Sequence, residues 1–311
     1  MKIAVLGAGA MGCLYGAYLS KKNQVLMIDS YRPQVEAIWE RGIAVVETDG
    51  SESYYKENIS AFLSGECPKK VDLVIVFVKS TNTETALEEN RNLFSDETLV
   101  MTLQNGAGND RKVAKYADSK NILIGTSKHN AINLGSGRTR HGGSGATTIG
   151  SNAHCTEPLE RVAEILRACG FGGTVSDDIQ RIIWSKLFVN LSVNAFTAIT
   201  ETPIGYLAKN AYAWNFAKRL IYEAVEVAEA DGTYFDRREV LEMVRKVCID
   251  DAGGYSSMYQ DRKRRVKMEI DAINGAVVEQ AKLYGVPTPY NALIVDLIHA
   301  IEGAYDLYDK P

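Results

Sequence analysis

The feature that most constrains the fold is a glycine-rich turn near the start of the sequence. Three glycines give the spacing G-x-G-x-x-G in Gly7-Ala8-Gly9-Ala10-Met11-Gly12. The apolar run Lys2–Leu6, which predicts a strand, precedes the turn, and Met11–Ser20, which predicts a helix, follows it. In such a turn the glycines allow a tight bend, close approach of a pyrophosphate and close packing of helix on strand. The pyrophosphate then lies at the positive end of the helix dipole, so residues 7–12 predict a dinucleotide site.

An acidic residue at the end of the next expected strand supports this interpretation. Asp29 follows the run Gln24–Ile28, about 20 residues after the glycines, where a carboxylate accepts hydrogen bonds from the ribose hydroxyls of adenosine. Other interpretations stay open. The glycines are also compatible with a turn that binds no ligand, or with a flavin in place of a nicotinamide, and Asp29 with a simple turn residue.

Strand and helix patterns alternate through the first half of the chain. A helical pattern covers Arg32–Arg41, and further strands are expected at Val71–Val78, Leu99–Leu103 and Ile122–Gly125. This alternation predicts an α/β fold with a doubly wound, mostly parallel sheet, the Rossmann type. The segment Arg138–Gly150 is rich in glycine and polar residues, and predicts a loop or a hairpin at the domain edge.

From about residue 178 the strand signals end. Helical periodicity covers four segments: Asp178–Thr200, Ala208–Ala230, Arg237–Ile249 and Ser257–Tyr284. A chain of 311 residues is long for a single core. We therefore expect a dinucleotide-binding Rossmann domain over residues 1–177, followed by an all-α substrate and catalytic domain over residues 178–311.

Composition and charge argue against several other classes. The net charge of −4 disfavours nucleic acid as a partner, and the basic run Arg262–Arg265 with Lys267 is better interpreted as a solvated helix face. No apolar run approaches the roughly 18 residues that predict a membrane span, and glycines interrupt the apolar N-terminal segment, which disfavours a signal peptide. Five cysteines without a close pair predict free thiols and a cytoplasmic location. The four histidines lack ligand-like spacing, so no metal site is expected.

A polar stripe marks the first expected helix of the second domain. Lys186, Asn190 and Asn194 recur every four residues, and therefore lie on one face of an otherwise apolar helix. A solvated stripe usually contains better helix formers than asparagine, so directed hydrogen bonding is the more natural explanation. A lysine in a partly desolvated cleft has a lowered pKa and serves as a general acid, which the reduction of a ketone requires. An exposed face or a domain interface remains the alternative.

Several motifs together resemble the ketopantoate reductase family over nearly the whole chain. Besides the glycine turn and the stripe, these are Lys79 after the strand Val71–Val78, Thr102-Leu-Gln-Asn-Gly-Ala-Gly108, Ser256-Ser-Met-Tyr-Gln-Asp261 and Glu269-Ile-Asp-Ala-Ile-Asn-Gly275. The last two are long and specific. The resemblance implies hydride transfer from NADPH or NADH to a small 2-keto acid, giving pantoate from ketopantoate in pantothenate and coenzyme A biosynthesis.

The resemblance also implies a role for each matching residue. Lys186 would protonate the keto oxygen, and Glu269 would orient that lysine and hold its charge. Asn190 and Asn194 would contact the substrate, and Ser257 its carboxylate. Asn105 would lie beside the nicotinamide and ribose, and Lys79 near the cofactor. Without the family pattern, Asn105 would be interpreted as a turn residue, Ser257 as a helix N-cap and Glu269 as a charge on a solvated helix.

Three departures from the family pattern leave the substrate and the cofactor open. An acid, Asp29, stands where many NADPH users place an arginine soon after the strand, and Arg32 comes late. Ile204 and Gly254 stand where close reductases tend to have asparagines that would hold the hydroxyl end of ketopantoate. An NAD-dependent D-2-hydroxyacid dehydrogenase acting on branched or aromatic 2-keto acids is the alternative. A non-catalytic dinucleotide sensor is disfavoured by the presence of Lys186 and Glu269. The oligomeric state is open, with a homodimer as one option.

Overall fold

The computed structural model describes residues 1–153 and 156–307, and the chain divides into two compact units. The first unit comprises Met1–Gln104 and Asn109–Ile179. The second comprises the chain from Gln180 onward together with the short segment Asn105–Gly108. His154 and Cys155 lie outside the described residues, and the four described cysteines are free and buried.

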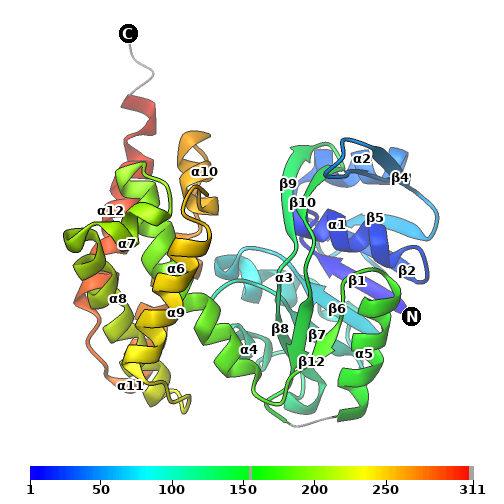
Figure 1. The fold of residues 1–311 in the computed structure, drawn as a ribbon. Helices are drawn as coiled ribbons and strands as arrows, with labels where there is room; N and C mark the ends of the chain where they lie inside the picture. The colour runs from blue at the N-terminus through cyan, green and yellow to red at the C-terminus, as the bar shows by residue number, and fades with distance from the viewer. Residues whose placement is uncertain (154–155, 308–311) are drawn as a thin grey trace. The chain divides into compact units, whose positions relative to one another are not determined.

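The first unit is built on an eight-stranded, mostly parallel sheet with the order β12-β11-β8-β7-β6-β1-β2-β5 (Figure 1). The strands from β12 to β5 in that order are Thr174–Val175, Thr147–Gly150, Ile122–Ser127, Leu99–Thr102, Leu73–Val76, Lys2–Leu6, Gln24–Asp29 and Ile59–Leu63. Leu6 pairs with Ile28 on one side and with Val76 on the other, so β1, β2 and β6 end at the same edge of the sheet. The strand expected over Val71–Val78 is shorter than predicted, because only its four central residues form β6.

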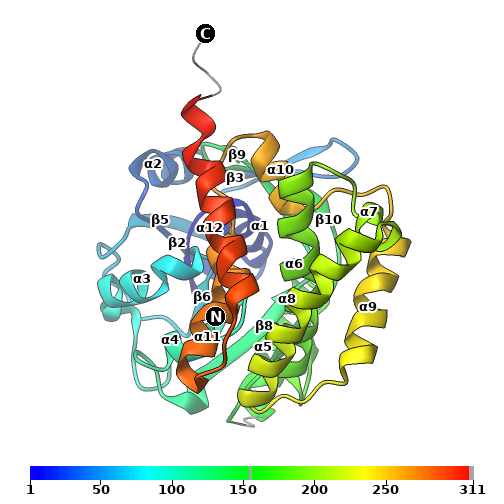
Figure 2. The same ribbon diagram turned by 90° about the vertical axis from the view of Figure 1, so that its left-hand side faces the viewer.

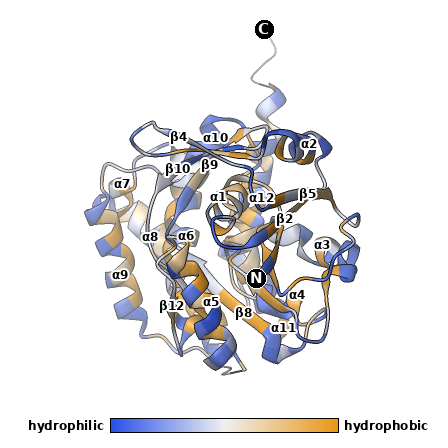
Figure 3. Ribbon diagram, turned by 90° about the vertical axis from the view of Figure 1, so that its right-hand side faces the viewer, coloured by the Kyte–Doolittle hydropathy of each residue, from blue (hydrophilic) through white to orange (hydrophobic). Residues whose placement is uncertain are grey.

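Helices cover this sheet and close its core. They are α1 (Ala10–Leu19), α2 (Arg32–Arg41), α3 (Thr83–Glu89), α4 (Asn109–Val113) and α5 (Thr156–Ala168), with short 3₁₀ turns at Ser80–Asn82, Arg91–Leu93 and Ser119–Asn121. The central strands bury both faces, which explains their nearly continuous apolar sequences. In Figure 3, β8 is coloured hydrophobic for the same reason.

A second sheet of four strands, in the order β4-β3-β10-β9, packs on α1. Its strands are β3 (Ile43–Val46), β4 (Glu52–Tyr55), β9 (Asn130–Gly135) and β10 (Arg138–Gly143). The prediction of a loop or hairpin over Arg138–Gly150 is therefore wrong in part, because this segment holds β10 and β11, which belong to different sheets. Thr139 and His141 are buried while their neighbours on β10 are exposed, so polar residues here follow the alternation of a half-buried strand.

The second unit is helical. Its helices are α6 (Ile179–Thr200), α7 (Gly205–Lys209), α8 (Ala211–Ala230), α9 (Arg237–Asp250), α10 (Ser257–Lys263), α11 (Asn274–Tyr284) and α12 (Pro289–Gly303), with 3₁₀ turns η4 (Ile270–Ala272) and η5 (Tyr305–Leu307). The single helix expected over Ser257–Tyr284 is wrong, since α10 and α11 are separated by an irregular segment in which Arg265 has a φ of +54°. In Figure 3, α9 alternates hydrophilic and hydrophobic residues, as expected for a helix with one buried face.

Helix α6 is the buried centre of the second unit. By length and composition it could cross a membrane, contrary to the expectation that no run is long and apolar enough. Most of this stretch is buried within the protein, and Trp184, Phe188 and Leu191 are fully enclosed. That burial is typical of a core helix, whose apolar residues contact other helices on several sides.

Candidate active site

The first unit contains a cavity of about 320 Å³ at the carboxyl ends of β1, β2 and β6. Leu6, Gly7, Ile28, Asp29 and Val78 line it from these strand ends. The remaining lining residues are Ser30, Ser64, Asn82, Thr85, Ala86, Glu89 and Asn90. Open α/β sheets bind ligands outside the carboxyl ends of their strands, so this cavity has the position expected for a dinucleotide.

The glycine turn beside this cavity has the geometry that a pyrophosphate needs. Gly7 has a φ of +98°, and a Cβ there would lie 2.7 Å from the backbone nitrogen of Val78. A Cβ on Gly12 would lie 1.8 Å from the Gly7 carbonyl oxygen. A Cβ on Gly9 would meet nothing within 4 Å, so packing within the protein does not require a glycine there. The open space at Gly9, at the start of α1, suits a ligand that approaches the backbone closely. Ala8 is buried, while Ala10 and Met11 are half-buried in the first turn of α1.

Asp29 supports the glycine turn as well as lining the cavity. Its Oδ2 accepts a hydrogen bond of 2.7 Å from the Ala8 amide, and its Oδ1 accepts one of 2.8 Å from the Tyr31 amide. The turn interpretation of Asp29 therefore describes part of what it does. Each carboxylate oxygen can accept more than one bond, so capacity remains for ribose hydroxyls.

Positive charge near this cavity is limited. Lys79 lies three residues after the end of β6 and is exposed, at the start of the 3₁₀ turn Ser80–Asn82. Arg32 is also exposed, with its guanidinium 3.9 Å from the Glu36 carboxylate. Glu89 adds a second carboxylate to the cavity lining besides Asp29. The described residues that line the cavity therefore include two carboxylates and no lysine or arginine.

Two residues at the nucleotide cavity and the glycine turn were not predicted from the sequence. Glu89 is one, and Gln34 on α2 is the other. The Gln34 Nε2 donates to the Ala8 carbonyl over 2.7 Å, and its Oε1 accepts from the Gly137 amide over 3.0 Å. Gln34 thus connects the glycine turn to the β9–β10 hairpin. No signal in the sequence pairs residues 8, 34 and 137, because they meet only in the folded unit.

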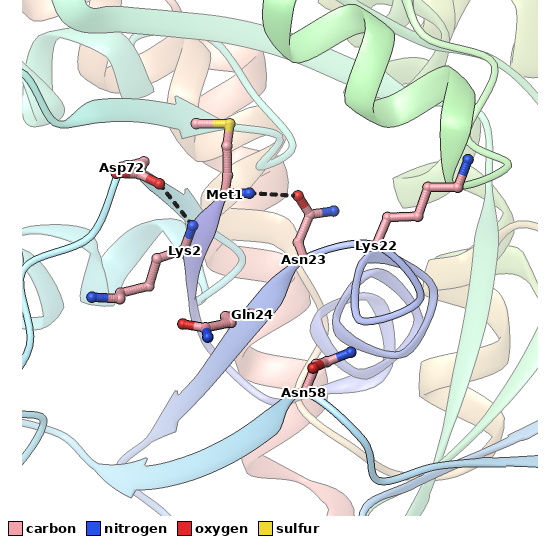
Figure 4. A pocket seen from close by; sticks show the side chains of 7 residues that line it. All are labelled: Met1, Lys2, Lys22, Asn23, Gln24, Asn58 and Asp72. Atoms are coloured by element: carbon pink, nitrogen blue, oxygen red, sulfur yellow. Dashed lines mark hydrogen bonds between the residues drawn. The ribbon is translucent and has the colours of Figure 1, made fainter.

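A second cavity in the first unit, of about 480 Å³, lies at the amino ends of β1 and β2 (Figure 4). Lys2, Gln24 and Asp72 are among its lining residues, and the Asp72 carboxylate accepts a hydrogen bond from the Lys2 amide. Parallel sheets do not use the amino ends of their strands for ligands. We therefore assign no function to this cavity.

The second unit brings together three of the residues expected in the catalytic site. Asn105 Nδ2 donates a hydrogen bond of 2.9 Å to Glu269 Oε2, although the two residues are 164 positions apart. Lys186 lies half-buried on α6. Burial lowers the pKa of Lys186 below its ordinary 10.5, and the nearby Glu269 carboxylate partly opposes this effect. Glu269 is therefore not a charge on a solvated helix. It lies just before the turn η4, near the Lys186 side chain, and it accepts a hydrogen bond from the Asn105 side chain.

The other expected substrate residues lie on α6 and α10. Asn194 is buried and Asn190 half-buried on α6. Ser257 is exposed at the first position of α10. It is not the N-cap, because Ser256 Oγ accepts from the Tyr259 amide over 3.1 Å. Ser256 also shares a hydrogen bond of 2.7 Å with Thr197, which connects the start of α10 to α6.

Ile204 and Gly254, two of the positions that depart from the family pattern, are neighbours. The Ile204 amide donates to the Gly254 carbonyl over 3.0 Å, and the Ile204 side chain is buried in the core of the unit. A Cβ on Gly254 would lie 2.2 Å from a carboxylate oxygen of Asp251. Asp251 thus occupies the space that a side chain at position 254 would need. Neither position offers a polar side chain here.

Over the described parts of the chain, no cluster of three or more histidine, cysteine and acidic side chains could hold a metal ion. The first unit thus contains a cavity at the carboxyl ends of its strands, and the second contains a lysine with a carboxylate nearby.

Comparison with known proteins identifies this combination. The family profile "Ketopantoate reductase PanE/ApbA" matches residues 3–154, and its C-terminal counterpart matches residues 178–302. The chain belongs to the ketopantoate reductase family. A 2-dehydropantoate 2-reductase from Streptococcus pyogenes is 31% identical over 99% of this chain and 100% of its own length. One from Halobacterium salinarum is 32% identical over 96% and 98%.

Solved structures agree with this membership. A ternary complex of D-mandelate dehydrogenase with NADH and anilino(oxo)acetate has a TM-score of 0.88 at 32% identity, covering 98% of this chain and 100% of that one. A putative 2-dehydropantoate 2-reductase from Enterococcus faecalis has a TM-score of 0.78 at 30% identity, with 97% and 98% covered. This ketopantoate reductase family member is an oxidoreductase that uses a nicotinamide cofactor.

Proposed function

We propose that the protein reduces a small 2-keto acid to the corresponding 2-hydroxy acid, with ketopantoate as the first candidate substrate. The observation that carries this proposal is Lys186, whose pKa is lowered by burial beside the Glu269 carboxylate. A lysine in this setting is a suitable proton donor near neutral pH. The names of the curated relatives, 2-dehydropantoate 2-reductase, support the choice of substrate.

In the proposed reaction the protein supplies a proton and orients the keto acid. Bound NAD(P)H would supply the hydride, with its electron pair, to the carbonyl carbon. Lys186 Nζ would donate a proton to the carbonyl oxygen as negative charge develops there, and would regain one from solvent afterwards. Glu269 would hold Lys186 in its charged form before transfer, because an opposite charge favours the ammonium. Asn190 and Asn194 would hydrogen-bond the substrate, and Ser257 its carboxylate.

On the cofactor side, residues 7–12 would hold the pyrophosphate and Asp29 the adenosine ribose. Asn105 would lie beside the nicotinamide and ribose, and the exposed Lys79 near the cofactor. Asp29 and Glu89 both line the nucleotide cavity and would repel a 2′-phosphate. NADH use is therefore part of the proposal. A cytoplasmic location and a homodimer remain predictions.

A D-2-hydroxyacid dehydrogenase is the second candidate. The D-mandelate dehydrogenase complex favours it, because that protein was solved with NADH and an aromatic keto-acid analogue and is 32% identical to this chain. Ile204 and Gly254 favour it as well, since neither provides a polar group for the hydroxyl of ketopantoate. The two candidates share the same chemistry at the keto acid and differ at the far end of the substrate.

Steady-state kinetics with a panel of keto acids distinguishes the two. We expect ketopantoate to be reduced, with 2-ketoisovalerate or 2-ketoisocaproate within about 100-fold in kcat/KM, because an apolar pocket discriminates weakly against a missing hydroxyl. Branched analogues more than about a thousandfold worse would contradict this tolerant pocket, since that ratio requires polar groups left unpaired. Inert ketopantoate with active branched or aromatic keto acids would establish the second candidate.

The cofactor preference is tested at Asp29. We expect the wild-type enzyme to use NADH at least as well as NADPH. Asp29→Asn should shift the ratio of kcat/KM values toward NADPH by about tenfold, because one like-charge contact costs about 1 kcal/mol or more. The asparagine oxygen can accept only one of the two bonds that the carboxylate accepts, from the Ala8 amide or from the Tyr31 amide, so the thermal stability of the variant is measured alongside its kinetics. Asp49→Asn, at an exposed position that does not line the cavity, is the control. A strong NADPH preference in the wild type would refute this role of Asp29.

A further inference from the structure

Three polar side chains form a buried hydrogen-bonded chain inside the second unit, apart from the residues proposed to contact substrate. Glu223 on α8, Asn291 on α12 and Asn274 on α11 are its members, and both asparagines are fully buried. Asn291 Nδ2 donates to Glu223 Oε2 over 2.7 Å, and Asn274 Nδ2 donates to Asn291 Oδ1 over 3.0 Å. In Figure 2, α12 runs beside α8 and α11, which it contacts.

This hydrogen-bonded chain of side chains ends on α6. Asn274 Nδ2 also donates to the Leu191 carbonyl oxygen over 3.1 Å, next to Asn190 and on the helix that carries Lys186. Asn274 itself is the first residue of α11, two residues after the turn η4 and five after Glu269. One amide group therefore joins the two segments that carry Lys186 and Glu269.

The turn that carries Glu269 is also held by the segment Asn105–Gly108. Asn105 bonds to the Glu269 carboxylate over 2.9 Å. A Cβ on Gly106 would lie 2.1 Å from the Ala272 carbonyl oxygen, so only glycine permits this close approach. With Asn105 and Gly106 fixing one end of the 269–274 segment, Asn274 fixes the other end against α6.

Stability alone is a poor explanation for this hydrogen-bonded chain of side chains. Burying amide and carboxylate groups carries a desolvation cost, and well-packed apolar residues of the same shape are often equally stable. The Glu223 carboxylate offsets its desolvation cost by also accepting hydrogen bonds from the backbone amides of Tyr290 and Asn291. Asn274 Oδ1 has no hydrogen-bond partner among the described residues. Because the side-chain oxygen of Asn274 is left without a partner, the presence of an asparagine at this position is better explained by the two hydrogen bonds that its side-chain nitrogen donates.

We propose that Asn274 is a positioning residue that sets the separation between the Lys186 ammonium and the Glu269 carboxylate without contacting the substrate. Its bond to the Leu191 carbonyl fixes the end of the 269–274 segment against α6, and its bond to Asn291 fixes that end against α12. The catalytic consequence rests on the proposed function, whereas the effect on Lys186 does not.

The main test is Asn274→Ala, compared with Asn210→Ala as a matched destabilising control. Asn210 caps α8 through the Tyr212 and Ala213 amides, and loss of such a cap typically costs about 1 kcal/mol. We expect Asn274→Ala to lower kcat about tenfold, with KM for the keto acid and cofactor affinity nearly unchanged. In a Lys186→Ala background the same change should have no further effect, because both act on one step.

A readout that needs no turnover is the titration of Lys186, followed by NMR of ¹⁵N-labelled lysine and assigned by its loss in Lys186→Ala. Burial is the larger influence on this pKa, so a loosened turn that admits water should raise the pKa toward 10.5. Asn210→Ala should leave it unchanged. If Asn274→Ala does not fold, Asn274→Ser, which keeps a shorter donor, takes its place in the same comparisons.

An unchanged Lys186 titration in the Asn274 variant, or a kcat loss that adds fully to that of Lys186→Ala, would overturn the positioning role. A wild-type enzyme that reduces no 2-keto acid would instead refute the proposed function. The titration would then still decide whether Asn274 positions the lysine.

Discussion

Replacement of Lys186 by alanine is expected to lower kcat by about a hundredfold or more, the usual scale for loss of a positioned general acid. Without the ammonium group, negative charge developing on the keto oxygen has no proton donor held beside it. Cofactor affinity should barely change, because the nucleotide cavity is formed by residues of the first unit. Stopped-flow or steady-state kinetics with NADH, combined with a binding titration of NADH, measures both quantities.

Lys246→Ala is a suitable control, since Lys246 is an exposed lysine on α9 that pairs with Asp250. It should retain wild-type kinetics. A Lys186→Ala enzyme with near-normal turnover would remove this lysine from the mechanism, and would leave the polar stripe of α6 without a catalytic explanation.

The second large effect is expected at Glu269. The carboxylate of Glu269 raises the pKa of Lys186 against the lowering by burial, so Glu269→Gln should lower that pKa further. A general acid acts only below its own pKa, so the decline of kcat at high pH should begin at lower pH than in the wild type. At neutral pH we expect kcat to fall by about tenfold to a hundredfold.

The glutamine oxygen can still accept the hydrogen bond from Asn105 Nδ2, so this substitution changes the charge more than the geometry. Glu279→Gln, at an exposed position on α11, is the matched control. A pH profile that moves to higher pH in Glu269→Gln, or does not move at all, would show that Glu269 does not hold the charge of Lys186.

The parts of the fold that sequence predicted well are those governed by local patterns. The glycine turn, the apolar parallel strands and the stripe on α6 each follow from spacing within about 20 residues. The second sheet was missed because β3 pairs with β10, which is distant in the chain, and because β4 and β10 are short and rich in polar residues. The break between α10 and α11 was missed because helical periodicity continues through the irregular segment.

The candidate site shows the same division. Spacing places Lys186, Asn190 and Asn194 on one helix face, but only the family resemblance suggested Glu269 and Asn105. Their hydrogen bond joins residues that no local rule relates. The role of Asn274 was not expected at all, because its partners on α6 and α12 lie 83 and 17 positions away.

The inclusion of residues 105–108 in the second unit has a consequence for protein engineering. In the sequence these four residues lie between β7 and α4 of the first unit. Ala107 nevertheless belongs to the core of the helical unit, and a Cβ on Gly108 would lie 1.9 Å from the side-chain nitrogen of Gln280. Exchange of the helical part with that of a relative at a single crossover near residue 179 would therefore pair this loop with foreign helices. Chimeras should be viable more often when the relative's own loop at 105–108 is exchanged together with its helices.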